Sequence, residues 1–172
     1  MSKDVNHFSL GGGQMRTTVR LVDFPVNAAA IAGGADLGFG VKLFGFNDDL
    51  AYIAATDIVT VTGAGFTLSL QESDGNITAD TPDVGLGSVI ASGAVSVLSG
   101  TATFEDIMTG QTVNDANGTA EHNYVALATP TALTGAADCY LNIADGWAAS
   151  GEAAGGVVAS GLVTVDWMVH TA

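Results

Sequence analysis

Glycine punctuates the whole of this chain, and this feature limits its fold more than any other. There are 23 glycines among 172 residues, about twice the usual share. Between them lie short runs, rich in Val, Ile, Thr and Phe, in which apolar and polar residues alternate. A period of two is typical of β-strands that bury one face, and glycine is typical of the turns between them. The sequence therefore predicts an all-β protein.

We expect eight to ten strands, because no segment combines the length and the periodicity of an amphipathic helix. The expected strands are 17–26, 37–46, 52–53, 58–62, 66–70, 88–98, 101–107, 122–129, 138–144 and 161–170. Two of these runs are less regular, 88–98 and 101–107, and are also compatible with a short helical turn. Pro25 indicates a sheet edge or a strand end. Short strands, glycine turns and no helices favour a β-sandwich or barrel, and a jelly-roll sandwich fits the strand number and the long connections.

The first sixteen residues do not follow a strand pattern. Residues 1–10 mix polar and apolar side chains without a clear period, and Gly11–Gly13 forms a flexible joint. We therefore expect residues 1–16 to form an extended, flexible N-terminal arm, either disordered or ordered on a neighbouring molecule. Residues 17–172 are expected to form a single β-sandwich domain, which is long enough to bury a core of its own.

The charges are distributed unevenly along the chain. Residues 1–42 hold all four basic side chains and three carboxylates, a net charge of +1, and residues 43–172 hold fifteen carboxylates and no Lys or Arg, a net charge of −15. Such an acidic body repels phosphate backbones and anionic lipid headgroups, so we expect neither a nucleic-acid partner nor a membrane partner. The basic segment could instead dock on an acidic protein surface. Adaptation to a saline environment would also explain the acidity, but not the placement of the cations at one end.

The composition is apolar for a chain without a predicted membrane span. Hydrophobic residues make up 48% and charged residues 13%, the latter about half the usual share. We infer that apolar surface is buried between subunits, as in a homo-oligomer such as a dimer or trimer. A count inflated by Ala and Gly is the alternative. The first residues lack the apolar stretch of a signal peptide, so we expect the chain to be made and used without export.

Candidate metal ligands and nucleophiles are sparse. The three histidines, His7, His122 and His170, are far apart in sequence and show no metal-binding spacing, so no transition metal is predicted. The single cysteine, Cys139, alternates with apolar residues along an expected strand, which favours a buried structural thiol. No cofactor is expected.

Acidic and amide side chains gather in a few loops. Residues 114–118 and 74–76 have the oxygen ligands of a calcium loop but not its full spacing, and tight turns explain them better. Adjacent carboxylates occur at 48–49 and 105–106, where neighbours along a strand point to opposite faces and are poor catalytic pairs. No Gly-x-Ser-x-Gly elbow occurs. The sequence therefore predicts a protein that is not an enzyme.

Trp147 follows Asp145 and Gly146 and is expected near a turn. An exposed tryptophan there would anchor an interface. The alternative is that it caps the end of the core.

Three groups of segments resemble small structural proteins encoded beside the capsid genes of tailed bacteriophages. They are 38–46 with 50–53; 83–88 with 98–101 and 105–107; and 140–144 with Val157 and 161–167. The resemblance covers most of residues 17–169 and consists of strands and turns, not of a catalytic motif. It implies a β-rich virion protein with a jelly-roll-like fold, a capsid cement or decoration protein. In that family the chain continues past the tryptophan with a small Gly-Asp tail, whereas this chain ends Met168-Val-His-Thr-Ala172.

The leading hypothesis is therefore a non-enzymatic cement protein on the outer surface of the capsid, assembled in the host cytoplasm. It would bind the major capsid protein and stabilise the expanded head. The expected interface residues are Lys3, Arg16, Arg20, Lys42 and Trp147. Simple solvation is the alternative for each of the cations. Two other functions stay open: another virion component, such as a neck, tail or head-fibre protein, and a carbohydrate-binding β-sandwich.

Overall fold

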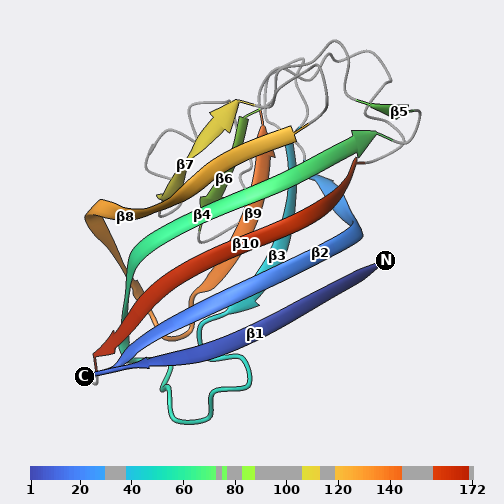
Figure 1. The fold of residues 1–172 in the computed structure, drawn as a ribbon. Coiled ribbons are helices and arrows are strands. Elements are labelled where there is room, and N and C mark those ends of the chain that lie inside the picture. The colour runs from blue at the N-terminus through green and yellow to red at the C-terminus, as the bar shows by residue number, and fades with distance from the viewer. Residues whose placement is uncertain are drawn as a thin grey trace.

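The structure is a computed structural model, and it describes residues 1–29, 38–72, 75–76, 83–87, 106–112, 119–144 and 157–170. Strands make up almost all of this part of the chain (Figure 1). They are β1 (Ser2–Gly11), β2 (Gln14–Ala29), β3 (Gly38–Gly45), β4 (Ile58–Glu72), β5 (Gly75–Asn76), β6 (Asp83–Gly87), β7 (Asp106–Thr112), β8 (Thr119–Thr134), β9 (Asp138–Ala144) and β10 (Val157–His170). The predicted all-β class is confirmed.

The strands form two antiparallel sheets, an arrangement consistent with a β-sandwich. The first sheet has the order β1-β2-β10-β4-β8. The second is built on β3, β9 and β6, with β7 along the other side of β6. Figure 1 shows β3, β9 and β6 running behind the first sheet and steeply across its strands. The end of β2 links the layers, because Asn27–Ala29 pairs with the start of β3.

The strand pairs are nested along the chain. β2 pairs with β10, β3 with β9, β4 with β8, and β6 with β7. Each pair encloses the next in sequence, so the chain from β2 to β10 folds like one long antiparallel hairpin doubled over on itself. Most of these pairings join residues far apart in sequence.

The core lies between the two sheets and follows the predicted alternation. Phe66, Leu68 and Leu70 of β4 are buried, and so are the inward residues of β10, including Trp167. The rings of Trp167, Phe46 and Phe44 meet edge to face, with centroids 5.2 and 5.1 Å apart. Such edge-to-face contacts add specific geometry to the burial of apolar area.

A bulge bends β2 where it leaves the first sheet. The register with β10 shifts between Ala159 and Gly161, and Asp23 takes a left-handed φ of 46°. The Asp23 N–H donates a hydrogen bond to the Ser160 hydroxyl at 2.8 Å. Gly161, with φ 144°, lies so close to β4 that a side chain would collide with the Thr67 carbonyl. The bulge therefore depends on glycine at this position.

Most strand predictions agree with the structure. The expected runs 17–26, 122–129 and 161–170 lie inside β2, β8 and β10, whereas 58–62 and 66–70 are two parts of the single strand β4. Pro25 lies beyond Val22, the last residue of β2 that pairs with β1, in a part of β2 where the β1 ladder has ended. Cys139 is fully buried, as predicted, and burial raises the pKa of its thiol.

Other predictions differ from the structure or fall outside it. Residues 52–53 form a turn and not a strand, and residues 88–105 lie outside the described residues. The structure does not show the extended N-terminal arm that was predicted for residues 1–16. Ser2–Gly11 is instead an edge strand, paired with β2 from Ser2 opposite Val22 to Gly11 opposite Gln14. An edge strand needs no buried apolar face to pair, which is why the alternation gave no signal.

Candidate functional site

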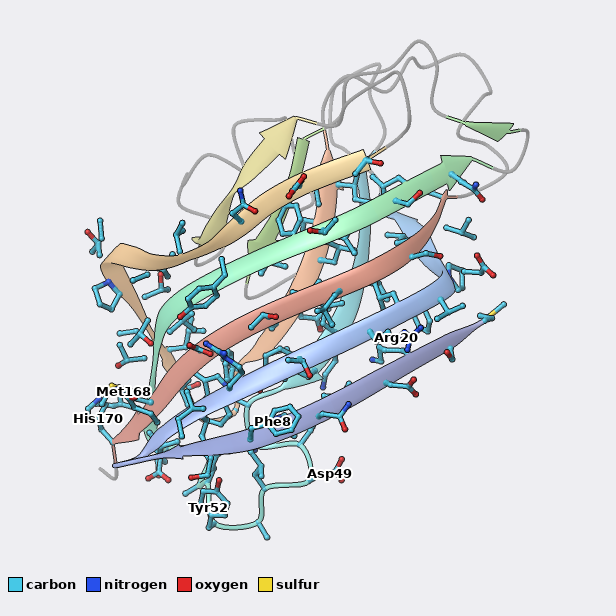
Figure 2. The ribbon with its side chains drawn as sticks, in the orientation of Figure 1. Phe8, Arg20, Asp49, Tyr52, Met168 and His170 are labelled. Atoms are coloured by element: carbon cyan, nitrogen blue, oxygen red, sulfur yellow. The ribbon has the colours of Figure 1, made fainter. Side chains whose placement is uncertain are left out.

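The outward-pointing side of the first sheet, here called the outer face, brings together side chains from β1, β2, β8 and β10. Cross-strand register sets Phe8 beside Arg16, and Arg16 beside Asp166. Four residues further along β2, Arg20 lies between Asp4 and Leu162. The inward neighbours of these residues, such as Val19 and Val165, are fully buried, so this side points away from the core. Figure 2 shows Phe8 and Arg20 on this sheet.

A network of Arg16, Asp166 and Tyr124 lies on the outer face. Arg16 donates from Nε to Asp166 Oδ1 and from Nη2 to Oδ2, each at 2.7 Å. The Tyr124 hydroxyl donates to the same Oδ2 at 2.6 Å, and the Arg16 guanidinium lies 5.1 Å from the Tyr124 ring centroid. Gly63 lies under Tyr124, where a side chain would collide with the hydroxyl. Two-pronged guanidinium–carboxylate pairs fix geometry as well as charge.

The network shifts the acidities of its members. Burial alone would raise the pKa of Asp166, but the hydrogen bonds from Arg16 and Tyr124 and the Arg16 charge outweigh it and hold that pKa below its ordinary value. The pKa of Arg16 rises because of its hydrogen bonds to Asp166. The pKa of Tyr124 rises through burial and through the neighbouring carboxylate. The side chain of Asp166 is only 12% exposed, so its charge is neutralised locally.

Large apolar and aromatic side chains are exposed within the network and around it on the outer face. Phe8 is 50% exposed, Leu162 47% and Tyr124 46%. Arg20 is exposed too. Among the lysines and arginines, which all lie in the described part of the chain, it is the one whose side chain makes no hydrogen bond or ion pair. Tyrosine, phenylalanine and arginine are the residue types that protein interfaces favour.

The other two predicted interface cations lie elsewhere, where β1 approaches β3. Lys42 Nζ lies 2.9 Å from Asp138 Oδ1 and 3.2 Å from Asp48 Oδ2, and its hydrogen bond to Asp138 is the main cause of its raised pKa. Lys3 Nζ donates to the Lys42 carbonyl at 2.9 Å. Burial and the nearby Lys42 charge lower the pKa of Lys3.

The charge separation seen along the sequence is therefore partly cancelled in three dimensions. Arg16 is paired with Asp166, and Lys42 with Asp48 and Asp138, all of them carboxylates of the acidic body. Of the predicted interface residues, the structure brings Arg16 and Arg20 together on the outer face and leaves Lys3 and Lys42 near β3. Trp147 lies outside the described residues.

Where the structure describes them, the other sequence candidates form no assembled centre. In the part of the chain that the structure describes, no three His, Cys, Asp or Glu side chains are grouped so as to hold a metal ion. Asp48 accepts a hydrogen bond from the Gly45 N–H at 2.7 Å in addition to its ion pair, so it stabilises a turn. Residues 114–118 and Asp74 lie outside the described residues, as does Glu105.

Sequence reasoning missed the contribution of Phe8, Tyr124, Leu162 and Asp166 to this face. The alternation in 161–170 did place Leu162 and Asp166 on the same side of their strand. The alternation could not predict the cross-strand register, which sets Asp166 opposite Arg16, 150 residues earlier in the chain.

Comparisons with known proteins add no relative. No protein-family model matches the chain, and no curated protein or solved structure does. Within the described residues, no helix has the length and apolar character needed to cross a membrane.

Proposed function

We propose that this chain is a non-enzymatic virion structural protein, a capsid cement protein that binds the lattice of the major capsid protein and stabilises the expanded head. The resemblance of residues 17–169 to structural proteins of tailed bacteriophages supports the proposal. So does the architecture, because long antiparallel strands in two packed layers provide rigidity.

We further propose that the sandwich is a jelly roll. The nested pairing of β2 with β10, β3 with β9, β4 with β8 and β6 with β7 supports this topology. It gives the sheet orders β2-β10-β4-β8 and β3-β9-β6-β7, to which β1 adds an edge. Jelly rolls of eight strands occur in viral capsid proteins and also in lectins and enzymes, so topology alone does not decide between these functions.

The observation that carries the functional proposal is the outer face. It combines exposed Phe8, Leu162 and Tyr124 with a pre-organised Arg16–Asp166 pair in an otherwise acidic, weakly aromatic chain. Since the network already holds Arg16 and Tyr124 in place, little side-chain freedom would be lost on binding. Arg20 would supply the charge that meets an acidic patch on the capsid. The remaining acidic surface would keep particles apart by repulsion.

The test is co-sedimentation with expanded heads assembled without this protein. We expect the unmodified chain to pellet at a fixed copy number. Arg20→Glu combined with Leu162→Ser should lower the bound fraction about tenfold or more, since each change removes an exposed contact from the outer face. Tyr52→Ser is the matched control: it removes an exposed aromatic side chain from the loop after β3, away from this face (Figure 2).

Failure of the unmodified chain to pellet would contradict the cement proposal. Location in the particle by labelling would then distinguish a neck, tail or head-fibre protein. The carbohydrate-binding alternative draws on Tyr124 and Phe8, which are exposed beside polar side chains. It predicts binding on a glycan array that Tyr124→Ala abolishes, and the cement proposal predicts no signal there.

A further inference from the structure

β1 is one of the two long edge strands of the first sheet. Among the described residues it pairs with a single strand, β2, as β8 at the other edge pairs with β4 alone. The outward residues of β1 are exposed, and its inward residues Lys3, Val5 and His7 are only half-buried. Figure 1 shows it running along the outside of the sheet, with the N-terminus at its free end. Elements with so little buried side chain open locally at low cost.

The inward contacts of β1 are few and specific. Val5 packs against the edge of the core. His7 Nδ1 lies 2.9 Å from Thr17 Oγ1, and its ring meets Phe44 edge to face with centroids 5.9 Å apart. Lys3 adds a hydrogen bond from its Nζ to the Lys42 carbonyl, at 2.9 Å. The docking site on β2 and β3 therefore recognises this strand by its main chain and by a few side-chain contacts.

The turn that ties β1 to β2 consists of glycine. Gly11, Gly12 and Gly13 have φ values of 87°, 62° and 81°, which L-residues rarely adopt. Positive φ at both central residues is typical of the two-residue turns that close hairpins tightly. A side-chain Cβ at Gly11 or Gly12 would meet no atom within 4 Å, and one at Gly13 would meet only the Val169 carbonyl oxygen, at 3.8 Å. The turn thus requires glycine for its conformation and not for space.

We propose that β1 is an exchangeable strand, and that the partner is a second copy of this chain. When Gly12 and Gly13 extend, β1 leaves its own β2 and occupies the same edge of β2 in a neighbouring copy, which returns its own β1. Every contact between β1 and β2 outside the turn is regained in the exchanged pair, which is why such swaps cost little. This inference does not depend on the virion function.

The closed hairpin has one advantage, which is its short connection. A two-residue turn gives β1 a high effective concentration at its own β2, so dilute copies remain closed. The population of the exchanged form rises when the copies are crowded, as on any regular lattice, or when the closed turn is made unfavourable. The second condition provides an experiment in solution.

The test changes only the turn. Gly12→Val with Gly13→Val places two β-branched residues at left-handed φ, which should disfavour the closed hairpin by about tenfold for each residue. Gly12→Asn alone is the matched control, since Asn-Gly is a preferred sequence for this turn. The exchanged form has an extended linker, which valine favours.

Disulfide formation between two differently marked chains reads out the exchange. One chain carries Asn6→Cys and the other Thr18→Cys; these positions are register partners on the outer face. The native Cys139 is fully buried and stays unreactive. In the Val-Val background we expect mixed 6–18 dimers at least about tenfold above the Asn-Gly background. Dimers of one chain type would reveal simple face-to-face contact instead.

Three results would overturn the proposal. The first is mixed dimers at the same level in both backgrounds. The second is a Val-Val chain that carries both cysteines and still closes within itself as a monomer. The third is a Val-Val chain that gives no cross-link of either kind, with β1 detached. Light scattering on the uncross-linked proteins checks the result, since an exchanged pair has twice the mass of the closed chain.

Discussion

β1 and β10 flank the same strand, yet they are held by different forces. Both pair with β2 antiparallel, and β10 opposite Gln14–Val26 overlaps almost all of the stretch that β1 covers. β10 buries Val163, Val165 and Trp167 completely, whereas β1 buries no side chain completely. Equivalent hydrogen-bond ladders thus accompany very different side-chain burial. Net hydrogen-bond energies are modest in water, so burial decides which strand is fixed and which can leave.

The charged groups follow the same division. Asp166 of β10 is nearly enclosed and satisfied by Arg16 and Tyr124. Lys3 of β1 is half-buried beside the like charge of Lys42, and its pKa is lowered by burial and by that charge. β10 thus holds a carboxylate whose hydrogen bonds and charge are satisfied, and β1 carries a cation that is partly removed from water.

The largest loss of stability is expected for a substitution in the buried face of β10. Trp167→Ala should lower the free energy of unfolding by about 3–5 kcal/mol, because it leaves a cavity beside Phe46. It also removes the indole N–H donor to the Thr17 hydroxyl, a bond of 2.9 Å. Val5→Ala on β1 is the matched change and should cost about 1 kcal/mol or less. Urea unfolding followed by circular dichroism measures the free energy of unfolding of both variants. Equal losses would contradict the idea that burial fixes β10 and not β1.

The network on the outer face ranks second. Asp166→Asn removes the charge that Arg16 and Tyr124 share and should cost about 1–3 kcal/mol. Because the folded pKa of Asp166 lies below the ordinary 3.8, its stabilisation is complete above that pH and is lost as the pH falls through the folded pKa. Asp4→Asn, on the same face but at the edge, is the control. The same urea titration between pH 3 and pH 7 tests this, and identical curves for the two variants would refute it.

A smaller effect concerns how firmly β1 docks at acidic pH. Burial lowers the pKa of His7 from the ordinary 6.5, and this outweighs the opposing attraction of Asp49 and Asp48. The detached strand therefore binds a proton more readily than the docked one. Docking is strongest above pH 6.5 and weakens as the pH falls through the folded pKa.

The Trp167 indole N–H resonance should report this titration. The indole donates to Thr17, whose hydroxyl is shared with His7. We expect its NMR shift to move with a midpoint below 6.5 and the movement to disappear in His7→Gln. The substitution His170→Gln, at the end of β10, should leave this pH-dependent movement unchanged. A shift that survives in His7→Gln would assign the titration to another group.

The smallest effect on stability is expected for Arg20→Glu. Arg20 is exposed and unpaired within the described part of the chain, so the free energy of unfolding should change by less than about 0.5 kcal/mol. Binding to expanded heads should nevertheless fall. A large loss of stability would show that Arg20 supports the fold, and the binding loss could then not be assigned to the outer face.

The sequence allowed the buried strands to be predicted, and part of the edge strand β8, but not the edge strand β1. In 66–70 and 161–170 one face is fully apolar, so the period of two is visible. Ser2–Gly11 has neither face buried, and Lys3 and His7 point inward, so the pattern resembled a free arm. Alternation of apolar and polar residues marks a strand that buries one face, and β1, which is held mainly by its main chain, lacks a clear alternation.

The candidate site was predictable only in part, for a related reason. Arg16 and Arg20 were expected at an interface because of their charge, and both lie on the outer face. Their neighbours could not be named, since register between strands 150 residues apart depends on the bulge at Asp23 and on the whole sheet. The charge separation along the chain was also misleading in space, because Arg16 pairs with Asp166 and Lys42 with Asp48 and Asp138.

Native-state hydrogen exchange, resolved strand by strand, measures directly how firmly β1 is held. Amides of β1, and those of β2 that bond to it, should exchange through a local opening. Amides of β10 should exchange only through global unfolding, although both strands pair with β2. If β1 and β10 amides instead show the same protection and the same dependence on denaturant, β1 is an integral part of the sheet, and the idea of an exchangeable strand fails.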